Sequence, residues 1–107
     1  MASYSEIPIQ REEYRFEIRT SIDDVEYVLF FYWLERQERW CMDIKDANGD
    51  DLTLGIVLNV DRELIRQYTI EGMPSGMLFL MDMTDAHEEC GIDELGDRCK
   101  LIYVSDI

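Results

Sequence analysis

The stretch that decides the fold reads VEYVLFFYWL, from Val25 to Leu34, and nine of its ten residues are apolar or aromatic. A strand of this length spans roughly 33 Å at a rise of about 3.3 Å per residue. Alternation places every second side chain on the same side: Tyr27, Leu29, Phe31 and Trp33 on one, Val28, Phe30, Tyr32 and Leu34 on the other. Both sides are apolar, so we predict a central strand. One face would lie in the core, and the other against a second layer or another subunit.

The size and charge of the chain limit its organisation and its partners. Its 107 residues suffice for one hydrophobic core, so we expect a single domain over residues 1–107, with residues 1–6 frayed. Ten basic residues against twenty-four acidic ones give a net charge of −14. This charge repels phosphate backbones and makes duplex DNA a poor partner. A protein that mimics DNA would have the same charge, so acidity alone leaves that interpretation open.

The sequence predicts a soluble protein made in the cytoplasm. The first ten residues lack the basic start and apolar core of a signal peptide. The apolar run at Val25 is too short for a membrane helix and contains Glu26. Three cysteines make an odd number without the spacing of a disulfide framework, so we expect reduced thiols.

Alternating polar and apolar residues predict a series of strands joined by local hairpins. The predicted extended segments are Ile7–Ile9, Tyr14–Arg19, Val25–Leu34, Arg39–Lys45, Leu52–Leu58, Met77–Met83 and Cys99–Val104. Between them, Asp61 could cap a short helix near 61–68, in which Leu64, Ile65 and Tyr68 share one face. The predicted fold class is all-β and mainly antiparallel: a β-sandwich or partly open barrel of six to seven strands with one short helix.

Two glycines mark expected irregularities in the middle of the chain. Asn48-Gly49 tolerates positive φ angles and predicts a type I′ hairpin turn. Gly55 is a candidate β-bulge within a segment whose apolar residues otherwise recur at every second position, at Leu52, Leu54, Ile56 and Leu58.

Neither of the two candidate metal-binding sets has the spacing that a site requires. A zinc site would use His87, Cys90, Cys99 and Cys41, but the spacing matches no zinc knuckle, and Cys41 lies far along the chain. A calcium loop around Asp46–Asp51 would have its glycine in the wrong position and Val57 where the bidentate Glu belongs. We expect free thiols, an ordinary hairpin turn and no metal or other cofactor.

The acidic segment between Thr84 and Asp97 could in principle supply a general acid–base pair. Its carboxylates, with that of the preceding strand end, are Asp82, Asp85, Glu88, Glu89, Asp93, Glu94 and Asp97. No nucleophile, basic electrophile or phosphate-binding glycine loop accompanies them. We therefore predict a solvated charged loop and no enzyme activity.

The candidate interaction surface consists of aromatic residues and methionines on two strands. Methionine suits both irregular cores and adaptable interfaces, so the face bearing Met77 could be either. On the long strand we expect Phe30 and Tyr32, or the opposite set of Tyr27, Phe31 and Trp33, to stay partly exposed in a monomer. The candidate interface residues are Phe30, Tyr32, Phe31, Trp33, Met77, Phe79, Met81 and Met83.

Motifs spread over nearly the whole chain resemble those of the baseplate plug proteins of contractile-tailed phages, described for a cyanophage. They are Ile7-Pro8-Ile9, Trp33, Trp40-Cys41-Met42-Asp43-Ile44, Asn48-Gly49, Gly55-Ile56-Val57-Leu58, Asp61 with Leu64, Gln67 and Tyr68, Met73-Pro74-Ser75-Gly76-Met77-Leu78, Asp93-Glu94-Leu95-Gly96 and Leu101-Ile102-Tyr103-Val104. The order and spacing of these pieces, and most of all the last two, carry the resemblance. The chain departs from the pattern at Asp23-Asp24, where the family tends to place a glycine, and in its acidity.

The resemblance implies a virion structural protein of the tail baseplate, made in the host cytoplasm, without catalysis or cofactor. It implies a homotrimer that closes the tail tube at the central hub until ejection. Implied partners are further copies of the chain, the hub or spike proteins and the tape-measure protein, with no direct nucleic-acid binding and no membrane. The alternative, motivated by the charge of −14, is a small acidic inhibitor or DNA mimic that binds a basic host protein.

Overall fold

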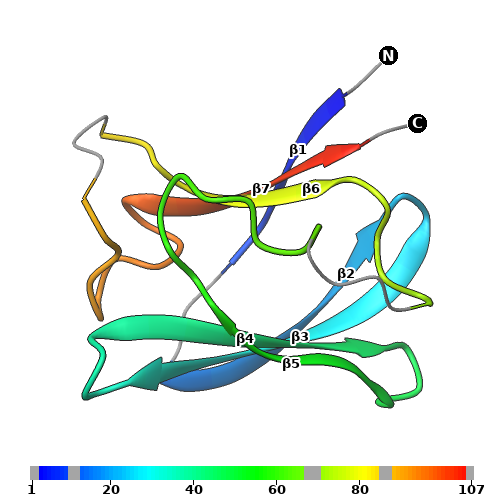
Figure 1. Ribbon diagram of the computed structural model, residues 1–107, viewed down its shortest axis with the longest axis horizontal. Helices are drawn as coiled ribbons and strands as arrows, with labels where there is room; N and C mark the ends of the chain where they lie inside the picture. Colours follow the sequence, from blue (N-terminus) through cyan, green and yellow to red (C-terminus); the bar gives the residue numbers. More distant parts are fainter. Residues whose placement is uncertain (1–2, 10–12, 67–70, 85–87, 106–107) are drawn as a thin grey trace.

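The computed structural model describes residues 3–9, 13–66, 71–84 and 88–105 as two antiparallel sheets facing each other (Figure 1). The small sheet has the strand order β1-β7-β6 and the large sheet the order β2-β3-β4-β5. The strands are β1 (Ser3–Ile7), β2 (Arg15–Ile22), β3 (Val25–Leu34), β4 (Arg39–Asp46), β5 (Asp51–Val57), β6 (Met77–Asp82) and β7 (Cys99–Ser105). The predicted all-β, antiparallel fold is confirmed, and it is a sandwich rather than a closed barrel.

Strand β3 is central in the large sheet, and its bounds match those predicted from the sequence. Its neighbours in sequence flank it in space, because tight turns connect β2 to β3 and β3 to β4. On one face, Tyr27, Leu29 and Phe31 are buried between the sheets, at 3%, 0% and 0% exposure. On the other face, Phe30 and Tyr32 are partly exposed. Of the two sets predicted to stay partly exposed in a monomer, this is the first.

The core between the sheets is built from the inward side chains of both. Trp40, Met42 and Ile44 on β4 share one core with Leu78 and Leu80 on β6, and all five are at most 1% exposed. Stacked and edge-to-face rings extend this core toward one end: Phe16 with Phe31 at 5.1 Å, Phe16 with Trp40 and Trp33 with Trp40 both at 5.8 Å. Such ring pairs add packing energy beyond the area they bury.

A polar connection ties the β2–β3 turn to the small sheet. The Tyr103 hydroxyl donates to Asp23 Oδ2 and the Ser105 hydroxyl to Asp23 Oδ1, both at 2.7 Å. Tyr103 also accepts a hydrogen bond of 2.8 Å from the Gly76 amide. A Cβ on Gly76 would lie 2.1 Å from the Val104 carbonyl oxygen, so only glycine lets the β6 entry approach β7 this closely.

The short helix predicted near 61–68 is wrong for residues 61–66, and Gln67 and Tyr68 lie outside the described residues. Asp61 has a φ of 63°, whereas a helix N-cap uses extended backbone. The amides of Asp61 and Leu64 donate to the carbonyls of Leu80 and Leu78, both at 2.9 Å. This segment therefore runs along the edge of β6, where strand pairing takes the donors that a helix would have needed.

The hairpin predicted at Asn48-Gly49 forms, but its turn is not type I′. Such a turn needs positive φ at both central residues, and only Gly49, at 87°, has it. The Gly49 amide donates to the Asp46 carbonyl at 3.0 Å. The Asp46 carboxylate also accepts from the amides of Asn48 and Asp50, at 2.9 and 3.0 Å. The Asp46 amide also donates to the Asp50 carbonyl at 2.9 Å, so residues 47–49 form a three-residue loop that the Asp46 carboxylate stabilises.

A β-bulge at Gly55 changes which residues of β5 face the core. The register with β4 shifts between Met42 and Ile44, and Gly55 has a φ of 75°. As a result Thr53 points inward at 5% exposure and Leu54 outward at 55%. The predicted bulge is present, and it breaks the predicted period of two, because Leu54 does not share the inward face of Ile56 and Leu58.

The frayed start expected for residues 1–6 does not hold for the described part of that segment. Residues 3–7 form β1 and pair with β7 from Ser3 opposite Ser105 to Ile7 opposite Leu101. Ile7 anchors this edge strand because its side chain is only 3% exposed.

Candidate interaction surfaces

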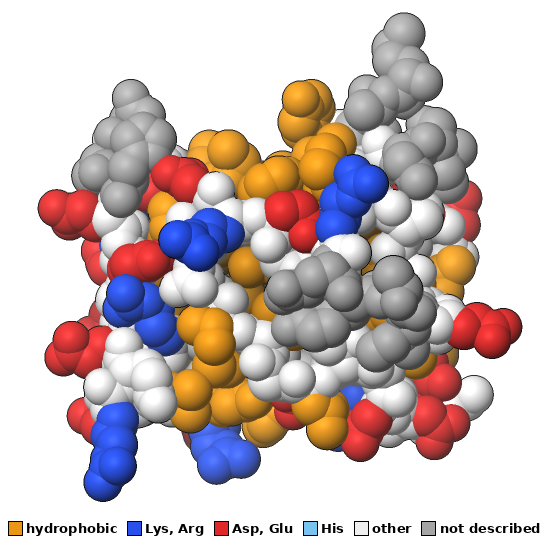
Figure 2. Space-filling view, in the orientation of Figure 1, with side chains coloured by type: hydrophobic (Ala, Val, Ile, Leu, Met, Phe, Trp, Pro, Cys, Tyr) orange, Lys and Arg blue, Asp and Glu red, His pale blue; other side chains and the backbone are white. Residues whose placement is uncertain are grey.

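The outer side of the small sheet carries a continuous apolar strip, which we call the small-sheet face. Its residues are Tyr4, Met77, Phe79, Met81, Met83, Ile102 and Val104. Cross-strand pairing makes it continuous, since Val104 lies between Tyr4 and Met77, and Ile102 lies opposite Phe79. Tyr4, Met83 and Met81 are 77%, 60% and 41% exposed. Hydrophobic side chains gather over the small sheet at the upper edge of the molecule (Figure 2).

Among the described residues of this strip and its strands, the charged pair on the outer side is that of Lys100 and Glu6. Lys100 Nζ lies 3.8 Å from Glu6 Oε2 and donates to the Gly96 carbonyl at 2.9 Å. Lys100 pairs with Met81 across the strands, and Glu6 pairs with Ile102, so the two charges interrupt the apolar strip only locally. Exposed apolar surface of this kind is typical of interaction sites.

The outer side of the large sheet has a different character. Phe30 and Tyr32 lie side by side with ring centres 5.6 Å apart, and the Arg15 guanidinium lies 5.6 Å from the Phe30 ring centre. The Tyr32 hydroxyl donates to Asp43 Oδ1 at 3.2 Å. Burial and the nearby Asp43 carboxylate raise the pKa of Tyr32 to about 12. Polar groups of the chain itself therefore already engage this aromatic pair.

The candidate interface residues thus fall into four separate places. The four on and after β6 share the small-sheet face, while Phe30 and Tyr32 share the outside of the large sheet. Phe31 is 0% exposed in the core and is not available to a partner in this conformation. Trp33 is partly buried at the end of β3, where its indole Nε1 donates to Glu35 Oε2 at 3.1 Å.

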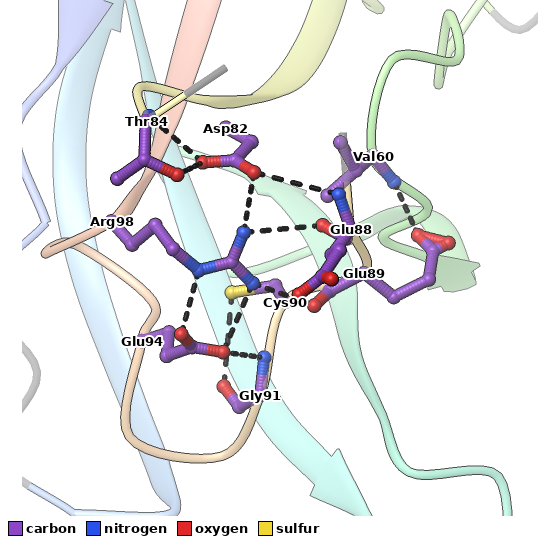
Figure 3. A network of polar contacts seen from close by, with 9 residues as sticks. All are labelled: Val60, Asp82, Thr84, Glu88, Glu89, Cys90, Gly91, Glu94 and Arg98. Carbon is purple, nitrogen blue, oxygen red and sulfur yellow. Dashed lines mark hydrogen bonds and ion pairs between the residues drawn. The ribbon is translucent and has the colours of Figure 1, made fainter. Parts of the chain in front are cut away.

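Sequence reasoning missed a network around Arg98 that fixes the loop before β7 (Figure 3). Arg98 Nε and Nη2 bind the two oxygens of Glu94 at 2.6 and 3.0 Å, and Nη1 lies 2.6 Å from Asp82 Oδ2. Nη1 and Nη2 also donate to the carbonyls of Glu88 and Glu89, at 3.3 and 2.7 Å. The five contacts together use every donor direction of the guanidinium. We call this set the Arg98 network.

The network shows that the acidic segment is not simply a solvated loop. The Asp82 side chain is 0% exposed and that of Arg98 is 14% exposed. Hydrogen bonds from Thr84, aided by Arg98, lower the pKa of Asp82 to about 2. The hydrogen bond from Arg98 and that from the Gly91 amide likewise lower the pKa of Glu94. A signal was present in the sequence: Asp82 follows Leu78 and Leu80 on the inward side of β6.

The three cysteines are free and buried, and they do not form a common site. Cys90 and Cys99 lie in the core, while Cys41 points to the outer side of β4. The hydrogen bond with Cys99 and burial raise the pKa of the Cys90 thiol. His87 lies outside the described residues. Among the described residues, no group of His, Cys, Asp and Glu could hold a metal ion.

The fold and its surfaces define a class of protein. It is a small antiparallel β-sandwich with an apolar strip on one outer face and, at one end, an acidic loop that the Arg98 network holds in place. The chain belongs to the family described as cyanophage baseplate Pam3 plug gp18, whose model matches residues 4–106. The resemblance read from the sequence is thereby confirmed, and it identifies a structural protein of the phage tail baseplate. A search of curated proteins finds no match. In the described part of the chain, no helix is long and apolar enough to cross a membrane.

Proposed function

We propose that this protein closes the tail tube at the central hub of the baseplate until ejection. It acts as a homotrimer, and the hub or spike proteins and the tape-measure protein are its partners. The protein is made in the host cytoplasm and has no catalytic role. Membership of the baseplate plug family supports this proposal.

The small-sheet face is the observation that carries the proposal. A chain with a net charge of −14 has ample polar surface, yet it exposes Met81, Met83 and Tyr4 together. Methionine side chains are unbranched and adapt to irregular partners. We therefore assign the contacts with other copies or with the hub to this face.

The acidity of the chain suits a protein that borders a DNA conduit. Carboxylates repel passing phosphates, so DNA leaving the tube would not adhere to the displaced plug. The same charge opposes contact between copies, and burial of an apolar face must offset this repulsion. Assembly should therefore strengthen as salt screens the charges.

The alternative of a DNA mimic needs a continuous acidic stripe, and the described charges do not favour one. Along β2, Glu17 lies between Arg15 and Arg19, and Arg19 contacts Glu26 at 3.0 Å. In the view of Figure 2, basic side chains lie among the acidic ones. The Arg98 network also neutralises Asp82 and Glu94 within the fold. Of the two, Asp82 has a side chain that is 0% exposed, so its carboxylate cannot contribute to an acidic surface stripe.

The test uses phage that lack this gene, propagated on cells that supply the protein in trans. The test variant, M81Q/M83Q, removes apolar surface without changing the charge. The matched control, L54Q, alters an equally exposed residue on the large sheet. We expect both variants to fold, with M81Q/M83Q largely absent from virions by mass spectrometry and L54Q present as in the wild type.

Closure itself is tested by nuclease access to DNA in particles with uncontracted tails. Particles without the plug should lose DNA to added nuclease, while wild-type particles stay protected. Equal protection in both would refute the closing role. Absence of the wild-type protein from purified virions would refute the location as well.

A further inference from the structure

A groove separate from the small-sheet face lies between the β3–β4 turn and the start of the loop before β7. Its cavity volume is about 400 Å³. Its lining includes Trp33 and Ile92 as apolar walls, with Glu38, Arg39 and Glu89 as charged groups. Both segments lie at the left of the molecule in Figure 1.

Contacts within the chain hold the loop side of the groove in place. The Trp40 indole donates to the Gly91 carbonyl at 3.2 Å, and the Gly91 amide donates to Glu94 Oε1 at 2.7 Å. The Arg98 network fixes the carbonyls of Glu88 and Glu89 just before it (Figure 3). A preformed wall lowers the entropy lost on binding, so the groove suits a specific ligand.

Arg39, the cationic residue in the groove lining, already has partners within the chain. Arg39 Nη1 donates to the carbonyls of Gln37 and Glu38 at 3.4 and 3.0 Å, and Arg39 Nε lies 3.7 Å from Glu89 Oε2. Glu38 is exposed, and Glu35 lies against the edge of the Trp33 indole. Glu89 Oε1 also accepts from the Val60 amide at 2.7 Å. The groove therefore offers an aromatic wall, that of Trp33, beside one exposed carboxylate, that of Glu38.

We propose that this groove binds a cationic side chain, that of arginine, from a basic segment of a partner protein. A guanidinium is attracted to the face of an indole and forms hydrogen bonds to carboxylates at the same time. The net charge of −14 favours a basic segment over an acidic one at long range. The inference does not depend on tube closure, because it concerns a different surface and a binding equilibrium measured on the purified protein.

The test is a titration of the isotopically labelled protein with N-acetyl-arginine amide at physiological salt, followed by NMR. We expect saturable shifts of the Trp33 indole N–H and of the Gly91 and Ile92 amides. The uncharged isostere N-acetyl-citrulline amide should bind at least tenfold more weakly, as should N-acetyl-glutamate amide.

Two variants of equal charge localise the binding. E38Q should weaken binding by about twofold to fivefold, as expected for an exposed charge pair. E71Q removes one charge from an exposed position outside the groove lining and should leave binding unchanged. The proposal is overturned by shifts that do not saturate, by equal binding of the citrulline probe, by preferred binding of the glutamate probe, or by equal effects of E38Q and E71Q.

Discussion

The β2–β3 turn offers a matched pair of substitutions with opposite expected effects. Asp23 and Asp24 are its two central residues, with φ angles of 52° and 65°. Both therefore adopt the left-handed conformation of a type I′ turn, which glycine adopts without steric cost. The chain thus has two aspartates in left-handed conformation, and substitution of one by glycine should relieve strain.

The magnitudes follow from what each side chain touches. The left-handed conformation costs an L-residue about 1–2 kcal/mol, and a substitution by glycine removes this cost. Glycine also makes the unfolded chain more flexible, which lowers the free energy of unfolding by about 0.5–1 kcal/mol. D24G should therefore stabilise the protein by about 0.5–1 kcal/mol. D23G has the same conformational gain but loses the hydrogen bonds from Tyr103 and Ser105, each worth about 1.5–3 kcal/mol to a carboxylate. Its net effect should be a destabilisation of about 2–5 kcal/mol.

The assay is equilibrium unfolding in urea, monitored by the fluorescence of the two tryptophans. The midpoint should rise for D24G and fall for D23G, with an unchanged slope if both remain two-state. A loss of stability in D24G would refute the strain argument. Equal midpoints for the two variants would refute the role of Asp23 in tying the sheets together.

Three further outcomes test the packing and the charges. G76A should destabilise the protein by about 1–3 kcal/mol because its Cβ would collide with the Val104 carbonyl, and a neutral result by urea unfolding would contradict the close approach. The contacts that lower the pKa of Asp82 and Glu94 stabilise the folded state. This contribution is fully present above about pH 4, where the two carboxyl groups ionise in the unfolded chain, and it is lost as the pH falls toward 2. The melting temperature should therefore fall over that range, and a constant value would contradict the network. L54T should change the unfolding free energy by less than about 0.5 kcal/mol, since the side chain is 55% exposed; a larger loss would mean that Leu54 packs.

Local sequence pattern predicted most of the fold. The ten residues of β3 contain no Gly, Pro or Asn, and polar turns flank them, so their bounds could be read directly. The hairpin partners on both sides followed from short connections. A period of two also separated Leu29 and Phe31 from Phe30 and Tyr32, although only the structure shows which face the small sheet covers.

The failures have specific physical causes. The helix near Asp61 fails because a strand edge competes for its backbone donors, and Glu63 binds the amides of Ile65, Arg66 and Leu78. A β-bulge inserts an extra residue and shifts the alternation of side chains between the two faces. A count of every second residue therefore puts Leu54 on the same face as Ile56, whereas Leu54 is exposed. The Arg98 network was missed although the inward position of Asp82 was a local signal, because a local window does not show that Asp82 on β6 meets Arg98 just before β7. The groove beside Trp33 was missed for the same reason.

Pairing of the first and last strands has a consequence for synthesis on the ribosome. β7 is the middle strand of the small sheet, with β1 and β6 on either side of it (Figure 1). The four consecutive strands of the large sheet can pair as soon as they emerge, but β1 and β6 must wait for β7. Until then the nascent chain exposes the inner side of the large sheet. The nascent chain should therefore be at greatest risk of aggregation just before β7 becomes available for pairing.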